Sequence, residues 1–362
     1  MVGGREVVDI KFGSRPVTRV MHGDKLVWKV KGREPFTVAV RDDLGLAELP
    51  TLGGAKWGSA VLAPNGFIYG IPASGAAVLV IDPANGTATL TDFGLNLSGT
   101  LKWYSAALGP NGKIYAVPYN APEVLVIDPA SGTATLTDFG LNLPGGNNKW
   151  IGAVLGPDGR IYAIPYYATD ILIIDPDSNS ATRTDFGIDL SGTGKWIGGA
   201  LGPDGKIYGI PYSATDILII DPSTESATRT NMGAELTGLA KWTGGVRAAT
   251  GKIYGIPRSS EHALIIDTAS GEATLEDFGL TLTGSNKWRG GVLGPDRRIY
   301  CAPYNATDVL VIDPAKGTAT RTNFGLDLSG NNKWSDLVTA NDKAYGIPFD
   351  AGDFLILSQE AA

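Results

Sequence analysis

The sequence has one cysteine, Cys301, and only two histidines, His22 and His262, among its 362 residues. A single cysteine excludes an intramolecular disulfide and any metal site built from several cysteines. Two histidines make His-rich metal ligation an unfavourable interpretation, so we expect neither a metal nor another cofactor. No apolar run reaches about 18 residues, and the N-terminus lacks the continuous apolar segment of a signal peptide, so we expect no membrane insertion and no leader.

Charge is unevenly distributed along the chain. Residues 1–33 contain eight Lys or Arg and three Asp or Glu, whereas residues 34–362 contain 22 basic and 34 acidic residues. Residues 34–362, here called the body, are therefore acidic. This argues against a nucleic-acid partner, because affinity for nucleic acid comes mostly from neutralising phosphates. A basic segment ahead of an acidic body is typical of a docking segment.

An internal repeat dominates the sequence. The dipeptide Lys-Trp occurs seven times at intervals of 46 or 47 residues, and seven of the eight tryptophans lie in this register. The tryptophans of the repeat are Trp57, Trp103, Trp150, Trp196, Trp242, Trp288 and Trp334. A period of this length indicates a solenoid or a propeller.

One repeat, residues 195–240, predicts four short strands. We expect these strands at 196–201, 206–212, 216–221 and 226–230, separated by turns rich in Gly, Pro and Asp. The third strand is apolar on both faces, which requires cover on both faces, as stacked neighbouring blades would provide. The pattern predicts an all-β protein, a β-propeller with seven four-stranded blades.

Closure of the ring can also be predicted. The last repeat stops after its third strand, and residues 36–41 form an unassigned strand ahead of the first repeat. We expect this N-terminal strand to complete the last blade, so that no sheet edge is left open. The domains are then a small β module at 1–33 and the propeller at 34–362.

Two motifs should lie together on one face of the ring, here called the upper face. They are the Lys-Trp pairs before the first strand and Ile-Pro-Tyr-x-Ala-Thr-Asp after the second. Aromatic surfaces beside hydrogen-bonding groups suit sugars, and repeated weak sites would gain avidity on a multivalent surface. The alternative is that Trp packs between blades, Lys covers it and Asp caps a turn. The candidate residues are Lys102, Trp103, Lys149, Trp150, Lys195, Trp196, Tyr166, Asp170, Tyr212, Asp216, Tyr304 and Asp308.

The fifth repeat breaks the second motif. There Arg258, Glu261 and His262 replace the consensus Tyr, Thr and Asp, and His with Glu could act as a general base. The alternative is drift of an exposed loop. Three further residues, each just after a Lys-Trp pair, have no counterpart of the same type in the other repeats: Tyr104, Arg289 and Asp336.

The pattern Gly-Pro-Asp-Gly-Lys-Ile-Tyr-Gly-Ile-Pro, as at 202–211, resembles repeats in bacterial and viral β-propellers, including the streptogramin-lyase-like group. This resemblance covers about 320 residues and implies the propeller fold. The resemblance gives little support to lyase activity, because those enzymes use histidine and His262 is the only histidine in the propeller region.

Residues 8–29 resemble a segment common in bacteriophage tail and fibre proteins. Their pattern is a strand, Gly-Ser-Arg-Pro-Val, a second strand, Gly-Asp and then Leu-Val-Trp. We expect a three-stranded meander that is too small for its own core and that needs a partner or self-association. The apolar residues expected to support assembly are Phe12, Val17, Val20, Leu26 and Trp28.

These features give three functional hypotheses. The first is a non-enzymatic virion protein of a phage tail or fibre, anchored to other virion proteins by residues 1–33 and contacting host-surface glycan with its upper face. The second is a secreted or envelope-associated bacterial propeller lectin. The third is a streptogramin-lyase-like enzyme centred on Arg258, Glu261 and His262.

Overall fold

The computed structural model describes residues 34–46 and 54–359 in full, together with the backbone of four short strands near the N-terminus. These strands are β1 (Lys11–Phe12), β2 (Arg15–Pro16), β3 (Arg19–His22) and β4 (Lys25–Lys29). β1 pairs with β2 and β3 pairs with β4, both antiparallel, in place of the expected three-stranded meander. Two residues separate the strands of each pair, a spacing at which neighbouring strands pair with each other. The side chains of Phe12, Val17, Val20, Leu26 and Trp28 lie outside the described part, so their assembly role stays a prediction.

The first four blades follow the repeat in chain order. Blade 1 comprises β6 (Trp57–Leu62), β7 (Ile68–Pro72), β8 (Val78–Asp82) and β9 (Thr87–Thr91). Blade 2 comprises β10 (Trp103–Leu108), β11 (Ile114–Pro118), β12 (Val124–Asp128) and β13 (Thr133–Thr137). Blade 3 comprises β14 (Trp150–Leu155), β15 (Ile161–Pro165), β16 (Ile171–Asp175) and β17 (Ser180–Thr184). Blade 4 comprises β18 (Trp196–Leu201), β19 (Ile207–Pro211), β20 (Ile217–Asp221) and β21 (Ser226–Thr230).

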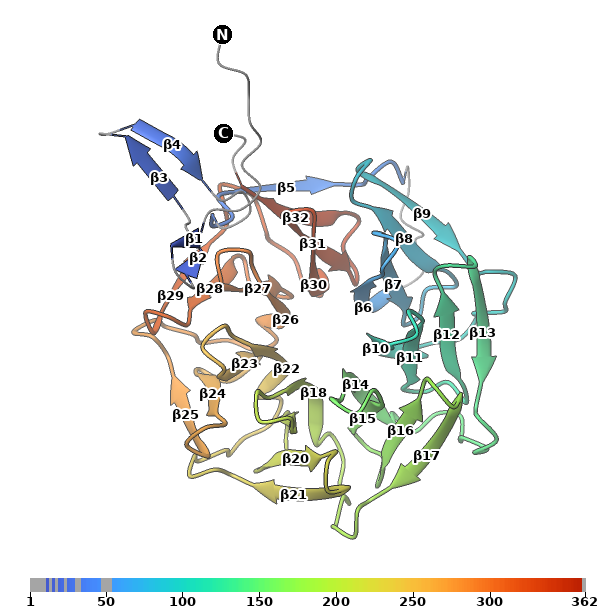
Figure 1. The fold of residues 1–362 in the computed structure, drawn as a ribbon. Coiled ribbons are helices and arrows are strands. Elements are labelled where there is room, and N and C mark those ends of the chain that lie inside the picture. The colour runs from blue at the N-terminus through green and yellow to red at the C-terminus, as the bar shows by residue number, and fades with distance from the viewer. Residues whose placement is uncertain are drawn as a thin grey trace.

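The remaining blades complete the ring. Blade 5 comprises β22 (Trp242–Arg247), β23 (Ile253–Pro257), β24 (Ala263–Asp267) and β25 (Glu272–Glu276). Blade 6 comprises β26 (Trp288–Leu293), β27 (Ile299–Pro303), β28 (Val309–Asp313) and β29 (Thr318–Thr322). Blade 7 comprises β30 (Trp334–Ala340), β31 (Lys343–Pro348), β32 (Phe354–Ser358) and β5 (Val38–Asp42). Each blade is an antiparallel sheet with its first strand nearest the axis and its fourth strand at the rim (Figure 1).

The predicted seven-bladed propeller is confirmed, and so is its mode of closure. β5 pairs antiparallel with β32, with Val40 opposite Ile356, so the first described strand of the ring completes the last blade. The backbone N–H of Phe36 also donates to the Tyr300 hydroxyl at 3.0 Å, and the two rings are 4.7 Å apart. No helix in the described residues is long and apolar enough to cross a membrane.

The turns explain why the strands end where they do. In blade 4 the N–H of Gly202 donates to the carbonyl of Lys206, and Gly205 adopts a φ of 80°, which a residue without a Cβ adopts at little cost. The Asp204 carboxylate accepts from the Tyr208 hydroxyl at 2.7 Å, which fixes the turn against the second strand. The observed strands of this blade agree with the predicted ones to within a residue at each end.

The hydrophobic core lies between neighbouring blades. Ile217 and Leu218 on β20 are both fully buried, but Ile217 packs with residues of blade 5 and Leu218 packs with residues of blade 3. This is the cover on both faces that the apolar third strands require. Near the axis the backbones approach so closely that a Cβ on Gly152 would lie 2.7 Å from the Cα of Gly198.

Candidate functional site

The tryptophans of the Lys-Trp pairs belong to the core. Trp103, Trp150 and Trp196 have side chains that are 0–2 % exposed. The indole N–H of Trp196 donates to the carbonyl of Asp216 at 2.8 Å, and every blade has an equivalent bond to the residue 19 or 20 positions on. Side chains of the protein itself cover these rings and leave no open face for a sugar, so the structure favours the packing alternative for these residues.

The lysines beside them are buried cations that hold the upper loops together. The ammonium of Lys195 donates to the carbonyls of Tyr166, Ala168 and Gly192 at 2.9–3.0 Å. Its nitrogen lies 5.9 Å from the centre of the Trp196 ring. Burial lowers the pKa to about 8 in six of the lysines: Lys102, Lys149, Lys195, Lys241, Lys287 and Lys333. Lys102, Lys149 and Lys195 are therefore structural groups rather than exposed ligand-binding groups.

The aspartates of the second motif are also engaged within the protein. Asp216 accepts from the Arg229 guanidinium at 2.8 Å, and that guanidinium lies 5.2 Å from the centre of the Trp196 ring. Asp308 and Arg321 form the same arrangement over Trp288, and Asp170 pairs with Arg183 over Trp150. Blade 7 repeats it with Asp353, Arg41 and Trp334. We call this arrangement the Asp–Arg–Trp clamp.

The arginines of the clamp lie outside the two motifs of the upper face. Their signal is visible, however: Arg183, Arg229 and Arg321 stand at the third position of Ala-Thr-Arg-Thr, where other repeats have Leu. Arginine occurs there only in repeats that carry Asp at the end of the second motif, and this pairing within one chain is what could have revealed the contact.

Five blades have an aromatic side chain at one equivalent position on the upper face, and these side chains lie around the axis. They stand directly after the proline that ends each second strand, and neighbouring rings are 5.5–5.9 Å apart where Tyr119 meets Tyr166, Tyr166 meets Tyr212, and Tyr304 meets Phe349. Blade 5 has Arg258 at this position, and its guanidinium lies 5.3 Å from the Tyr212 ring and 5.7 Å from the Tyr304 ring. Tyr166, Tyr212 and Tyr304 are thus brought together as expected. Tyr119 and Phe349 join them although their repeats depart from the Ile-Pro-Tyr-x-Ala-Thr-Asp motif.

Two residues without a counterpart of the same type in the other repeats, Tyr104 and Arg289, complete this group. Blade 1 has Ala73 at the ring position, and Tyr104 from β10 bridges the gap by contacting Tyr119 at 4.9 Å and Phe349 at 6.2 Å. Arg289 from β26 lies 4.8 Å from the Tyr104 ring, 4.9 Å from Phe349 and 5.4 Å from Tyr304. Because the contacts run through blades 2 to 7 and return to blade 2, they encircle the axis. We call the set the axial cluster: Tyr104, Tyr119, Tyr166, Tyr212, Arg258, Arg289, Tyr304 and Phe349.

Positive charge is concentrated in the axial cluster. Arg289 is 9 % exposed, and its guanidinium makes no hydrogen bond or ion pair with any residue that the structure describes. Arg258 donates one hydrogen bond, to Asn286 Oδ1 at 2.6 Å, and burial together with the charge of Arg289 lowers its pKa. The cluster therefore offers unused guanidinium donors to an incoming ligand.

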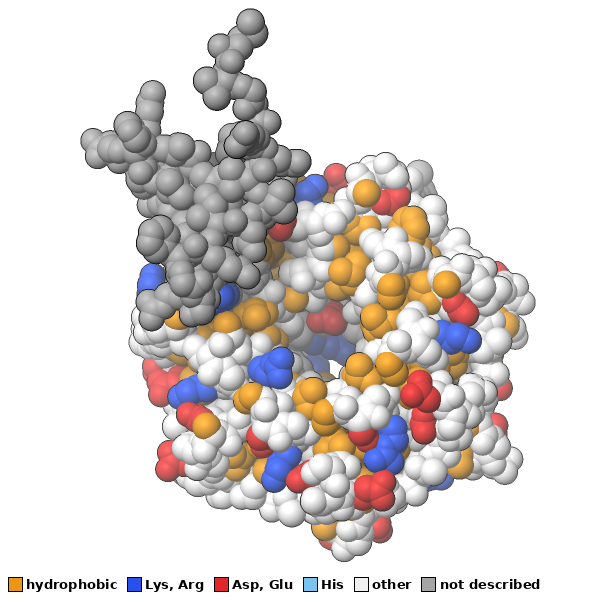
Figure 2. All heavy atoms as spheres, viewed as in Figure 1, with side chains coloured by type: hydrophobic (Ala, Val, Ile, Leu, Met, Phe, Trp, Pro, Cys, Tyr) orange, Lys and Arg blue, Asp and Glu red, His pale blue; other side chains and the backbone are white. Residues whose placement is uncertain are grey.

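Asp336 lies close enough to Arg289 for the two charges to interact. Burial raises the pKa of Asp336 to about 7, although the N–H of Leu337 donates to its carboxylate at 2.9 Å and Arg289 favours the charged form. Burial also raises the pKa of Tyr166 to about 12, so its hydroxyl stays protonated. Figure 2 shows that the ring is hollow at its centre and that side chains of both charge signs lie in the hollow.

The enzyme candidates are not brought together. Arg258 belongs to the axial cluster, Glu261 is exposed, and no hydrogen bond or ion pair between described residues joins Arg258, Glu261 and His262. His262 contributes its backbone, whose carbonyl accepts from the Trp242 indole at 2.7 Å and whose N–H donates to the Ser260 hydroxyl at 3.1 Å. This geometry shows no general-base pair.

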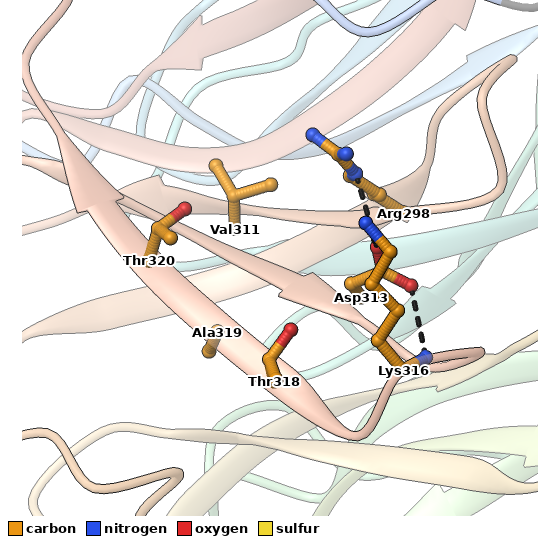
Figure 3. Close-up of a pocket in the computed structure, with 7 residues that line it drawn as sticks. All are labelled: Arg298, Val311, Asp313, Lys316, Thr318, Ala319 and Thr320. Atoms are coloured by element: carbon orange, nitrogen blue, oxygen red, sulfur yellow. Dashed lines mark hydrogen bonds and ion pairs between the residues drawn. The ribbon is translucent and has the colours of Figure 1, made fainter.

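Figure 3 shows a small pocket of about 140 Å³ on blade 6, lined by Arg298, Asp313, Lys316 and neighbouring residues. The Asp313 carboxylate already pairs with Arg298 at 3.4 Å and with Lys316 at 3.6 Å. Among the described residues no group of three or more His, Cys, Asp or Glu could hold a metal ion.

Comparison with known proteins shows the fold. No family model matches the sequence, and no curated protein is found to be similar to it. A streptogramin B lyase structure is 14% identical, with a TM-score of 0.70, and the match covers 90% of this chain and 99% of that one. A catalytically inactive virginiamycin B lyase from Staphylococcus aureus with quinupristin is 13% identical, with a TM-score of 0.69 and coverage of 88% and 98%.

An extracellular domain of a putative one-component system from B. thetaiotaomicron is 14% identical, with a TM-score of 0.64, and the match covers 91% of this chain and 44% of that chain. These identities are too low to carry an activity or a ligand over to this chain. They show a β-propeller.

Proposed function

We propose that this protein is a non-enzymatic virion protein of a bacteriophage tail or tail fibre, and that its propeller binds a host-surface glycan at the axial cluster. The observation that carries the recognition part is the closed ring of aromatic side chains with Arg258 and Arg289. Aromatic faces pack against the apolar faces of sugar rings, and guanidinium and hydroxyl groups supply the polar contacts that orient a ligand.

The anchoring part rests on residues 1–33. This segment carries an excess of five positive charges, its pattern resembles phage tail and fibre proteins, and residues 34–362 carry an excess of twelve negative charges. Opposite charges on the two parts favour assembly in a fixed orientation, with the basic segment against other virion proteins and the propeller outward.

A glycan array with the full-length protein tests recognition. We expect binding to a defined set of glycans and at least tenfold weaker binding by Arg258→Tyr, which removes one cation and restores the residue found in four other blades. The matched control is Arg247→Ala, because Arg247 is exposed at the opposite end of β22 and should leave binding unchanged. Absence of glycan binding by the unaltered protein, or equal binding by Arg258→Tyr, would contradict the proposal.

Deleting residues 1–33 tests anchoring. We expect the truncated protein to keep its glycan binding and to be missing from purified particles. A secreted or envelope-associated lectin is the alternative, since it needs the same upper face but no docking segment. Truncated protein that still enters particles would contradict the anchoring role.

A further inference from the structure

The Asp–Arg–Trp clamp occurs in four of the seven blades and has a consistent geometry. In blades 3, 4, 6 and 7 the guanidinium lies 5.2–5.7 Å from the centre of the Trp ring and pairs with the aspartate. Three of these arginines also donate to the carbonyl of the residue seven positions before the Trp. These bonds are Arg229 to Asp189 at 2.6 Å, Arg321 to Thr281 at 3.0 Å and Arg41 to Asp327 at 3.1 Å.

The other three blades have leucine where the clamp has arginine: Leu90, Leu136 and Leu275. Blade 1 has also lost the acid, since Ala77 stands at the aspartate position, and blade 5 has His262 there. Blade 2 is different, because Glu123 keeps a carboxylate at this position while the arginine is missing. Blade 2 therefore retains the acceptor of the clamp without its donor.

A pocket of about 260 Å³ opens at this place in blade 2. Its lining includes Trp103, Glu123 and Leu136, which are the three positions of the clamp, and Asn96, which stands seven residues before Trp103. The three positions that hold a guanidinium in other blades thus lie at one pocket. Trp103 itself is 2 % exposed, and Leu136 packs against the cluster that contains it.

Glu123 is available to a ligand. Among the described residues its carboxylate has no hydrogen bond and no ion pair, whereas Asp170, Asp216, Asp308 and Asp353 are all paired. The nearby Lys102 does not take this role, because its ammonium donates to the carbonyls of Ala73, Gly75 and Gly99. In blade 3 the equivalent Lys149 lies close to Arg183, so the lysine does not exclude a guanidinium.

We propose that the pocket over Trp103 binds the guanidinium of an arginine side chain supplied by a partner polypeptide. The bound group pairs with Glu123, donates to the Asn96 carbonyl and takes the place of the Leu136 side chain over Trp103, as Arg229 lies over Trp196 in blade 4. An arginine suits the site better than a lysine because its planar group can stack and form two hydrogen bonds at once. This site is separate from the axial cluster and does not depend on glycan binding.

The experiment is an NMR titration of the full-length protein that follows the indole N–H signal of Trp103, which donates to the Glu123 carbonyl at 2.8 Å. The probe is N-acetyl-arginine methylamide, and the matched probe is the citrulline compound, which has the same shape without the charge. We expect a saturable shift with the arginine compound, with affinity at least tenfold lower for citrulline and for Glu123→Gln.

Leu136→Arg provides the decisive variant, because it supplies the missing arginine from the chain itself. We expect it to abolish binding of the probe and to raise the melting temperature. Leu90→Arg in blade 1 is the matched control, since Ala77 offers no carboxylate, and it should leave the titration unchanged. The proposal is overturned if the arginine compound causes no saturable shift, if citrulline binds equally well, or if binding survives in Leu136→Arg.

Discussion

For Lys195 and its equivalents, the sequence fits both an exposed, ligand-binding ammonium and a buried, structural one. Sequence alone places each lysine beside a tryptophan at the start of a first strand, and both an exposed and a buried ammonium fit that placement. The three carbonyls that surround the Lys195 ammonium come from two different loops, 166–168 and 192. Their convergence depends on the packing of adjacent blades, so the burial of the lysine could not be predicted from its own repeat.

The axial cluster was easier to predict at the level of single residues. Tyr104, Arg258 and Arg289 attract attention because each departs from the repeat, and the structure places all three in the same cluster. Which of them touch could not be predicted, since the contacts of Arg289 cross the axis from blade 6 to blade 2. A linear repeat pattern contains no information about contacts across a ring.

Asp336 should make stability depend on pH. Its folded pKa of about 7 lies above the ordinary value of 3.8, so its protonated form contributes stability that is fully present below about pH 4 and is lost as the pH rises through 7. We expect the free energy of unfolding of Asp336→Asn, relative to that of the unaltered protein, to rise by up to about 1.4 kcal/mol per pH unit across this window. Urea unfolding at several pH values measures the difference, and a constant gap between the two proteins would contradict it.

At the scale of secondary-structure elements, the strands were predictable and the clamp was not. Turns with Gly, Pro and Asp bound every strand of a repeat, so strand ends follow from local backbone preferences. The clamp joins the third and fourth strands of a blade to the loop after the preceding blade, and Arg229 reaches 40 residues back to the Asp189 carbonyl. Such contacts depend on how the blades are stacked and not on the propensity of any one strand.

The clamp of blade 4 can be measured by a double-mutant cycle. Arg229→Leu leaves the mostly buried Asp216 carboxylate without its partner, so we expect a loss of about 1–3 kcal/mol in the free energy of unfolding. The double variant Asp216→Ala, Arg229→Leu copies blade 1, which has Ala77 and Leu90, and should recover most of that loss. Denaturant unfolding provides the values, and strictly additive effects would show that the pair is not coupled.

At the scale of the whole molecule, the sequence predicts the number of blades and the way the ring closes. Counting Lys-Trp pairs gives seven, and the missing fourth strand of the last repeat identifies residues 36–41 as its replacement. Both follow from comparing all seven repeats with one another, which is a property of the entire chain. The position of residues 1–33 relative to the ring does not follow in this way, because no repeat constrains it.

Deleting β5 tests closure. Removing residues 1–42 leaves β32 as an open edge and takes Phe36 and Ala39 out of the core between blades 6 and 7. We expect a lower midpoint of thermal unfolding and concentration-dependent association, because an unpaired edge is a template for other chains. Deleting only residues 1–33 is the control and should leave the midpoint unchanged. Equal midpoints for the two truncations would contradict a stabilising role for β5.

The pairing of β5 with β32 also has a consequence for engineering the chain. The break in the ring lies between the third and fourth strands of one blade, and the same two strands in the other six blades are joined by short exposed turns. Joining the ends and cutting one of those turns would give a circular permutant with the same ring of blades. If residue 359 is joined to residue 34, residues 1–33 can instead be placed ahead of the new first residue, at a chosen blade. Their position relative to Arg258 and Arg289 would then change without any change in the axial cluster.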